Sequence, residues 1–324
     1  MTSKERVQAA ISFQKPDRTP FNFWMDRRLM ADYEQRFGPA YRVHHYGADV
    51  VETFMDLRFP SAVESVYESG THWVTKPALD SVANAVDLPM PNPDDDFVLD
   101  LVKNDRREFP DKFLILDTAG ALTIMGGLRR YENVFTDFYD YPEEMTALLD
   151  RISDVTARAV ERACDCGIDA VYVMDDIGSK NGLLMSPAML EDWVLRFNRK
   201  SIDAAKAACL PVFSHSDGAV MDILDRLVEH GVQVVNPLEP HLNDLEAFRD
   251  RYQQPHKLAA YGALDTYGII RTGTPQDVRT HVSSTFELLG TSGGLIFSTH
   301  DIPIDTPQEN VDAMVDEIKQ CRPS

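Results

Sequence analysis

Short apolar runs alternate with longer amphipathic segments along this chain of 324 residues. Eight runs have the length and composition of strands: Thr19–Met25, Ala48–Phe54, Phe113–Asp117, Ala170–Met174, Pro211–Ser214, Gln233–Asn236, Leu258–Gly262 and Leu295–Ser298. Helical periodicity covers Lys4–Phe13, Leu148–Cys166, Pro187–Ala208, Met221–His230, Pro275–Leu289 and Pro307–Lys319. This α/β alternation predicts a parallel sheet, and eight strands match a closed (β/α)8 barrel, the TIM-barrel fold.

Start signals support two of these helices. Ser186-Pro187 and Thr274-Pro275 each place a capping hydroxyl before a proline at the first helical position. The interval at about 56–112, between the second and third strands, is too long for one crossover helix. Its Thr71–Thr75 run and the proline-rich Pro89–Asp96 predict a small hairpin that covers the barrel mouth. We expect a single barrel domain over residues 1–324 with this one excursion.

Metal-capable side chains follow several of the predicted strands. His215 and Asp217 alternate with Ser216, so both point to the same side of an extended chain. Glu239 and His300 each end a later run. In a barrel the carboxyl ends of the strands meet at one face, which predicts a site for a divalent transition metal formed by His215, Asp217, Glu239 and His300. Helix capping explains Asp175, Asp265 and Asp301 well enough.

The charge balance narrows the classes of binding partner. With 52 acidic and 32 basic residues the formal charge is -20, which disfavours nucleic acids and anionic membrane surfaces as partners. The four cysteines form no paired framework, as expected in a reducing cytoplasm. The N-terminus lacks an apolar signal segment, and no stretch approaches the roughly 20 apolar residues of a membrane span. A cytoplasmic protein is therefore expected.

Short blocks in a fixed order resemble the uroporphyrinogen decarboxylase superfamily along nearly the whole chain. They are Arg6–Ala10, Pro16–Pro20, Asp175–Asp176, Ser186–Pro187, His215–Gly218, Asn236–Glu239, Gly262–Asp265, Gly273–Pro275 and Pro307–Asn310. The resemblance implies a TIM barrel, in agreement with the strand count. True decarboxylases of that superfamily are metal-free and bind porphyrinogen carboxylates through an arginine-rich segment after the first strand. Here that segment reads Trp24-Met-Asp-Arg-Arg28 and lacks the glycine-containing arginine motif, which argues against coproporphyrinogen formation.

Another branch resembles this chain more closely at the strand ends. Methylcobamide:coenzyme M methyltransferases and, more distantly, cobalamin-independent methionine synthase hold a thiol-activating zinc with a His-x-Cys pair, a late cysteine and, in the synthase, a glutamate. The equivalent positions here are His215, Asp217, Glu239 and His300, so both thiolates are replaced by harder ligands. Such ligands favour oxygen groups over thiols. Zinc is the first expectation, and iron, nickel, cobalt and manganese also suit these ligands.

Three functions follow from the resemblance and the residues. The first is a metal-dependent methyltransferase that takes a methyl group from a small methoxylated or methylated molecule. Its methyl acceptor would be cobalamin on a separate corrinoid protein. Asp175 or Asp176 would supply a proton or orient the substrate, while Phe23, Trp24 and Tyr261 form an apolar wall and Asp26 also contacts the substrate.

The second function is a metal-dependent decarboxylase, lyase or hydrolase that acts on a small carboxylated molecule without a corrinoid. The third is a non-catalytic barrel whose polar cluster binds a metal or is only hydrogen-bonded. Four unpaired polar groups are costly to bury, which ranks this last. Many members of the superfamily are dimers, so a homodimer is the assembly that the resemblance implies.

Overall fold

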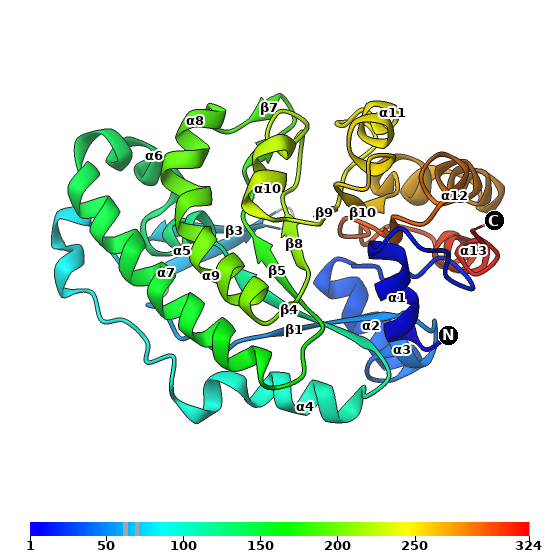
Figure 1. The fold of residues 1–324 in the computed structure, drawn as a ribbon, viewed down its shortest axis with the longest axis horizontal. Coiled ribbons are helices and arrows are strands. Elements are labelled where there is room, and N and C mark those ends of the chain that lie inside the picture. Colours follow the sequence, from blue (N-terminus) through cyan, green and yellow to red (C-terminus); the bar gives the residue numbers. More distant parts are fainter. Residues whose placement is uncertain (61–63, 69–70, 324) are drawn as a thin grey trace.

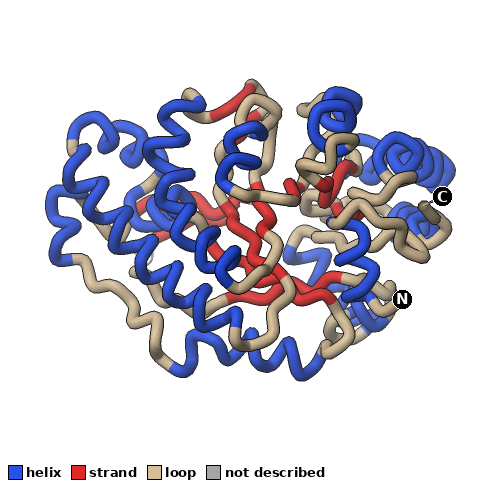
Figure 2. Tube along the Cα trace, in the orientation of Figure 1, coloured by secondary structure: helices blue, strands red, loops and turns tan. Residues whose placement is uncertain are grey.

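A curved parallel sheet forms the centre of the computed structural model, which describes residues 1–60, 64–68 and 71–323. Within these ranges the sheet has seven strands in the order β1-β4-β5-β8-β9-β10-β11. Their bounds are Val50–Phe54, Phe113–Ala119, Ala170–Met174, Val212–His215, Val234–Asn236, Ala259–Ala263 and Leu295–Ser298. Figure 2 shows the strands gathered in the middle with helices around them. The predicted TIM-barrel fold is confirmed.

The first predicted strand, Thr19–Met25, is wrong as a strand, although the segment occupies that place in the barrel. It makes only isolated parallel bridges, Phe21 with Phe297 and Met25 with Ile302. On its other side, the Asp49 amide donates to the Phe21 carbonyl at 2.8 Å. Pro20 has no amide hydrogen to donate. The Trp24 amide turns to the Thr299 hydroxyl at 3.1 Å instead of a ladder carbonyl. The segment thus closes the barrel between β1 and β11 without forming a regular ladder.

Two apolar clusters fill the space inside and outside the barrel. Alternate strand residues point inward, among them Phe113, Ile115 and Phe213, and helix α1 (Ser3–Ile11) adds Val7 and Ala10 to the same cluster. The other face of each strand packs against the surrounding helices in a larger core. The polar carboxyl ends of the strands therefore lie at the opposite end of the barrel from the α1 contact.

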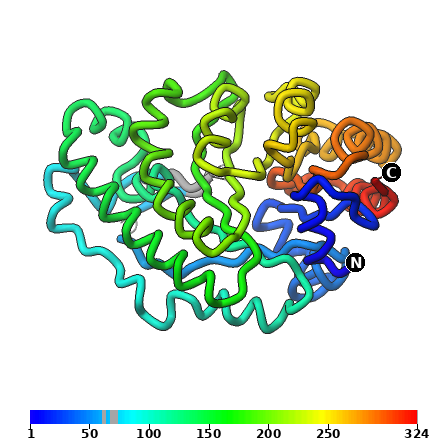
Figure 3. The backbone as a smooth tube through the Cα atoms, in the orientation of Figure 1, coloured from blue at the N-terminus to red at the C-terminus, as the bar shows by residue number. Residues whose placement is uncertain are grey.

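Several predicted helices are confirmed, with their ends shifted by up to six residues. They are α1, α7 (Pro142–Cys164), α10 (Leu224–His230), α12 (Pro275–Leu289) and α13 (Gln308–Ile318). The predicted Pro187–Ala208 helix consists of α8 (Pro187–Leu190), a π-helical turn Glu191–Leu195 and α9 (Arg196–Ala207). Both expected caps form, because Ser186 accepts from the Met189 amide and Thr274 from the Asp277 amide. Both chain ends are found at the same edge of the molecule, near α1 and α13 (Figures 1 and 3).

Other helices were not predicted. These are α2 (Arg27–Phe37), α3 (Tyr41–His44), α5 (Ala121–Arg129), α6 (Tyr131–Asp140) and α11 (Leu245–Phe248), with π-helical turns at Arg249–Gln253 and Thr266–Ile270. None of the helices in the described ranges combines the length and apolar character that crossing a membrane requires.

The excursion between β1 and β4 contains the predicted hairpin. Strands β2 (Glu64–Glu68) and β3 (Thr71–Lys76) pair antiparallel, while residues 69–70 lie outside the described part of the chain. Two 3₁₀ turns, Val82–Asp87 and Asp96–Leu99, and helix α4 (Asp100–Glu108) complete it. That the hairpin covers the barrel mouth stays a prediction.

Candidate active site

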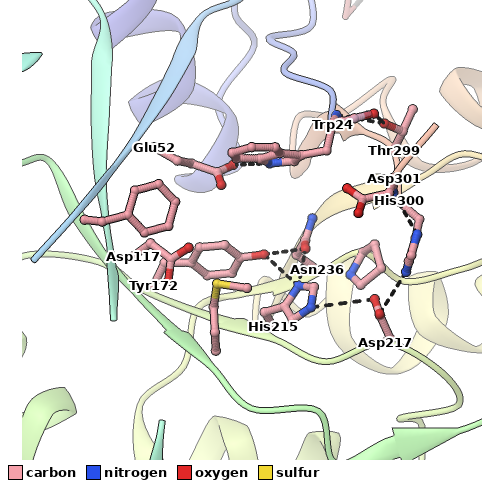
Figure 4. A pocket seen from close by; sticks show the side chains of 13 residues that line it. Trp24, Glu52, Asp117, Tyr172, His215, Asp217, Asn236, Thr299, His300 and Asp301 are labelled. Carbon is pink, nitrogen blue, oxygen red and sulfur yellow. Dashed lines mark hydrogen bonds and ion pairs between the residues drawn. The ribbon is translucent and has the colours of Figure 1, made fainter. Parts of the chain in front are cut away.

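A cavity of about 270 Å³ opens at the carboxyl ends of the barrel strands. It is lined by Trp24, Glu52, Phe54, Asp117, Tyr172, Met174, His215, Asp217, Asn236, Pro237, Thr299, His300 and Asp301. In the close view, Glu52 and Asp117 lie on one side, and His215, Asp217 and His300 on the other (Figure 4). Among these lining residues there is no lysine or arginine. Acidic groups, histidines and flat apolar side chains therefore define the cavity.

The alternation predicted after β8 is present. His215 and Asp217 both line the cavity, whereas the Ser216 hydroxyl faces away and accepts from the Ile177 and Gly178 amides at 2.9 Å each. The extended chain thus delivers two metal-capable side chains to one wall.

Hydrogen bonds hold the His215 ring in one orientation. Its Nδ1 lies 2.9 Å from the Tyr172 hydroxyl and 2.8 Å from Asn236 Oδ1. The Asn236 amide is oriented in turn, because its Nδ2 donates to the Tyr261 carbonyl at 2.6 Å. Since Asn236 Oδ1 only accepts, Nδ1 of His215 carries the hydrogen. Its Nε2 is thereby turned toward two carboxylates, the arrangement that outer partners give to metal-binding histidines.

Asp176, His215 and Asp217 offer ligand atoms that all lie within 4.8 Å of one another. His215 Nε2 is 3.5 Å from Asp176 Oδ1 and 3.6 Å from Asp217 Oδ1, too far for good hydrogen bonds. Ligand atoms around a tetrahedral zinc ion are about 3.4 Å apart, given metal–ligand bonds of about 2.1 Å. Asp217 Oδ1 is buried and has no hydrogen-bond partner among the described residues. A carboxylate oxygen in that situation needs a cation, so these residues fit a divalent metal.

The acidic surroundings also set the proton affinity of the histidine. Burial lowers the pKa of His215, but the interactions with Asp176 and Asp217 outweigh burial and raise the pKa to about 10. Burial raises the pKa of Asp176, but the neighbouring His215 cation brings it below its usual value. Without a metal the group is thus an imidazolium between two carboxylates. A metal ion would take the place of the proton on Nε2.

His300 contacts this group through Asp217. Its Nδ1 accepts from the Asp301 amide at 2.7 Å, so Nε2 carries the hydrogen that it donates to Asp217 Oδ2 at 2.8 Å. Glu239 is not among the residues that line this cavity, and its Oε2 accepts from the Gly218 amide at 2.8 Å. Glu239 lines a neighbouring hollow of about 750 Å³, to which Asp217 and His300 also belong. Of the four ligands predicted, the structure brings His215 and Asp217 together, adds Asp176, and places His300 behind Asp217.

The two aspartates predicted as catalytic differ sharply. Asp176 belongs to the metal-capable group, whereas Asp175 points into the protein, where it accepts from the Thr123 amide at 2.7 Å and from Asn198 Nδ2 at 2.6 Å. Burial raises the pKa of Asp175 to about 6, although these hydrogen bonds lower it. Asp175 is not among the cavity-lining residues, and it connects β5 to the start of α5.

Only Trp24 of the predicted substrate wall lines the cavity. Phe23 is fully buried in an aromatic cluster, with its ring 5.4 Å from that of Tyr46. Asp26 caps helix α2 by accepting from the Arg28 amide at 2.9 Å. Tyr261 is buried beneath the cavity and donates its hydroxyl to Glu52 at 2.6 Å.

Sequence reasoning missed most other residues of the cavity, among them the polar Glu52, Asp117, Tyr172 and Asn236. A signal was present for Glu52, which interrupts the apolar run Val50–Phe54, since an acid inside a barrel strand is costly to bury. Asp117 follows the apolar Phe113–Leu116 in the same way. The partners of His215 could not be found in this way, because pairing across three strands depends on register.

Comparisons with known proteins agree with this fold. The family model described as uroporphyrinogen decarboxylase (URO-D) matches residues 2–321. Two relatives carry the name uroporphyrinogen decarboxylase. The one from Synechococcus sp. is 22% identical over 85% of this chain and 77% of its own, and the one from Alkalilimnicola ehrlichii is 26% identical over 75% and 67%.

Among solved structures, a methyltransferase from Methanosarcina mazei matches with a TM-score of 0.76 and 17% identity, covering 99% of both chains. At that identity the match reports the fold. The family model spans nearly the whole chain, and the barrel with polar groups at its strand ends is the architecture expected from it. This chain belongs to the uroporphyrinogen decarboxylase family.

Proposed function

We propose that this protein is a metal-dependent methyltransferase that removes a methyl group from a small methoxylated or methylated molecule and passes it to cobalamin on a separate corrinoid protein. The observation that carries the proposal is the buried Asp217 Oδ1, which receives no hydrogen bond from the described residues and lies beside His215 Nε2 and Asp176. The resident ion would be a divalent transition metal, zinc first. When bound there, it would act as a Lewis acid toward a substrate oxygen.

The residues around the ion have distinct tasks in this proposal. Asp176, His215 and Asp217 hold the metal, and Tyr172 with Asn236 keeps the His215 ring aimed at it. His300 fixes the second oxygen of Asp217. Trp24 and Phe54 give the substrate flat apolar walls and limit the water in the cavity.

The charge of the cavity favours methyl transfer over decarboxylation. A carboxylated substrate needs cationic partners, and the described lining residues include no lysine or arginine, while the acidic Glu52 and Asp301 remain besides the groups that would hold the metal. A neutral methylated molecule meets no such repulsion. The methyltransferase from Methanosarcina mazei, which matches along the whole chain, adds support at the level of the fold.

Decarboxylation of a small molecule without a corrinoid is the second candidate. The names of the two relatives favour it, and a metal at Asp217 would itself attract one substrate carboxylate.

Two measurements separate these functions. Plasma mass spectrometry should find about one zinc per chain in wild type after reconstitution and none in His215→Ala, while the control His230→Ala, whose histidine pairs with Glu191 on the outside of the barrel, keeps the metal. The zinc-loaded protein, with reduced cobalamin and a panel of methoxylated molecules, should release demethylated products. Carbon dioxide release from carboxylated analogues without cobalamin would overturn the assignment.

A further inference from the structure

Two carboxyl groups face the cavity from the side opposite the histidines (Figure 4). Glu52 belongs to β1 and Asp117 to β4, and the two strands are neighbours in the sheet. Both side chains are largely buried, and neither belongs to the metal-capable group. The proposed methyl transfer assigns no task to either side chain.

Glu52 accepts hydrogen bonds from the described residues through only one of its two carboxylate oxygens. Its Oε1 accepts from Asn22 Nδ2 at 3.1 Å, from Trp24 Nε1 at 3.0 Å and from the Tyr261 hydroxyl at 2.6 Å. Three donors on one oxygen suit an ionised carboxylate. No donor among the described residues reaches Oε2, while the residue itself lines the cavity. Glu52 thus presents a fixed, unused acceptor to whatever binds there.

Asp117 complements it. It lines the cavity with 7% of its surface exposed, and no hydrogen-bond donor within the described ranges contacts its carboxyl. The titratable groups that line the cavity near it are Glu52 on the adjacent β1, Tyr172 on the adjacent β5 and His215 on β8, one strand further along the sheet. Burial and the charge of Glu52 raise the pKa of Asp117 well above its ordinary value, and only His215 opposes this. A buried carboxyl group that receives no hydrogen bond favours its neutral form, in which Asp117 has a proton to donate and no partner for it among the described residues.

An acceptor and a donor at one wall select for a particular group. A hydroxyl donates to Glu52 and accepts from Asp117 at the same time, whereas a carboxylate is repelled by Glu52 and a hydrocarbon leaves both groups unpaired. The surrounding Trp24, Phe54 and Met174 offer apolar contact over a space of about 270 Å³.

We propose that Glu52 and Asp117 together bind a hydroxyl group at the end of the substrate away from the metal-capable side chains, so that the substrate is a small, uncharged, hydroxylated molecule. This inference extends the proposed function, because the bound molecule is a substrate only if that function holds. The binding preference itself depends on the two carboxyl groups alone. Asp117 acts as a positioning and specificity residue.

Titration calorimetry with ring-sized probes at pH 7 tests the preference directly. Phenol should bind wild type at least tenfold more tightly than toluene, and benzoate should bind more weakly than phenol. Asp117→Leu removes the donor at similar volume and should reduce the preference for phenol over toluene about tenfold. Asp117→Asn keeps a donor and should stay within about threefold of wild type. Thermal unfolding of each variant, compared with the exposed α9 control Asp203→Asn, checks that it is folded.

Three results would overturn the inference: benzoate binding more tightly than phenol, benzylammonium binding more tightly than phenol, or Asp117→Leu retaining the full phenol preference. The outcome is separable from that of the proposed function. Phenol binding as expected without any methyl transfer would remove the methyltransferase and leave the hydroxyl site. Conversely, methyl transfer from a donor whose KM is unchanged in Asp117→Leu would support the methyltransferase and remove the hydroxyl site.

Discussion

His300 holds Asp217 by a single hydrogen bond, from Nε2 to Oδ2 at 2.8 Å, and leaves the other carboxylate oxygen facing His215. One histidine thus behaves as a ligand and the other as its support. Supporting groups of this kind change metal affinity by roughly 10–100-fold, whereas loss of a ligand removes the ion.

We therefore expect different metal losses in two histidine variants. His215→Ala should lose zinc almost completely, while His300→Ala should bind it roughly 10–100-fold more weakly. Competition with a zinc chelator gives both affinities. Equal, complete loss in the two variants would make His300 a direct ligand and contradict the assignment of its role.

The neighbours Asp175 and Asp176 should separate stability from metal binding. In Asp175→Asn the new amide faces Asn198 Nδ2, which cannot rotate because its Oδ1 accepts from the Ala121 amide at 2.8 Å. The unpaired donors should cost about 1–3 kcal/mol of unfolding free energy in urea. Asp176→Asn should keep wild-type stability and lose zinc. If Asp175→Asn were fully stable but bound no zinc, Asp175 and not Asp176 would be the metal ligand.

The stability difference between wild type and Asp175→Asn should depend on pH. The folded-state pKa of about 6 lies above the unfolded value of about 3.9. The stabilising contribution of Asp175 is therefore complete below pH about 3.9 and is lost as the pH rises through 6. Two pKa units correspond to about 3 kcal/mol, so the deficit of the variant should shrink by up to that amount between pH 4 and pH 7.5. A deficit that grows with pH would show that folding lowers the pKa of Asp175 instead of raising it.

Gly262 on β10 should tolerate no side chain. Its φ is +143°, and an added Cβ would lie 1.8 Å from the Pro237 carbonyl oxygen, next to Asn236. Gly262→Ala should destabilise the protein by about 4 kcal/mol or more, or abolish its folding. Gly127 in α5 has open space around it and is the matched control, where alanine should stabilise by roughly 0.5–1 kcal/mol. Urea unfolding of both variants measures this, and a stable Gly262→Ala would be inconsistent with the close approach.

The barrel could be predicted from the chain because each strand is a short apolar run and each ends at a polar group. The alternation through Ser216 correctly placed His215 and Asp217 on one wall. Glu239 was grouped with them because it ends a run, yet a carboxylate that far beyond β9 can turn to the Gly218 amide. Phe23 and Tyr261 looked like cavity walls from composition alone, and only packing shows that they lie beneath it.

The irregular closure of the barrel ties one wall of the cavity to the two ends of the chain. Trp24 stands on the segment that isolated bridges hold between β1 and β11. That segment starts where the Thr19 amide donates to the Cys321 carbonyl at 2.9 Å and the Arg322 guanidinium to the Asp17 carbonyl at 2.9 Å. Few ladder bonds mean a low free energy of local opening. Removing the last residues, which are almost 300 positions from Trp24 in the sequence, would therefore loosen the segment that carries Trp24.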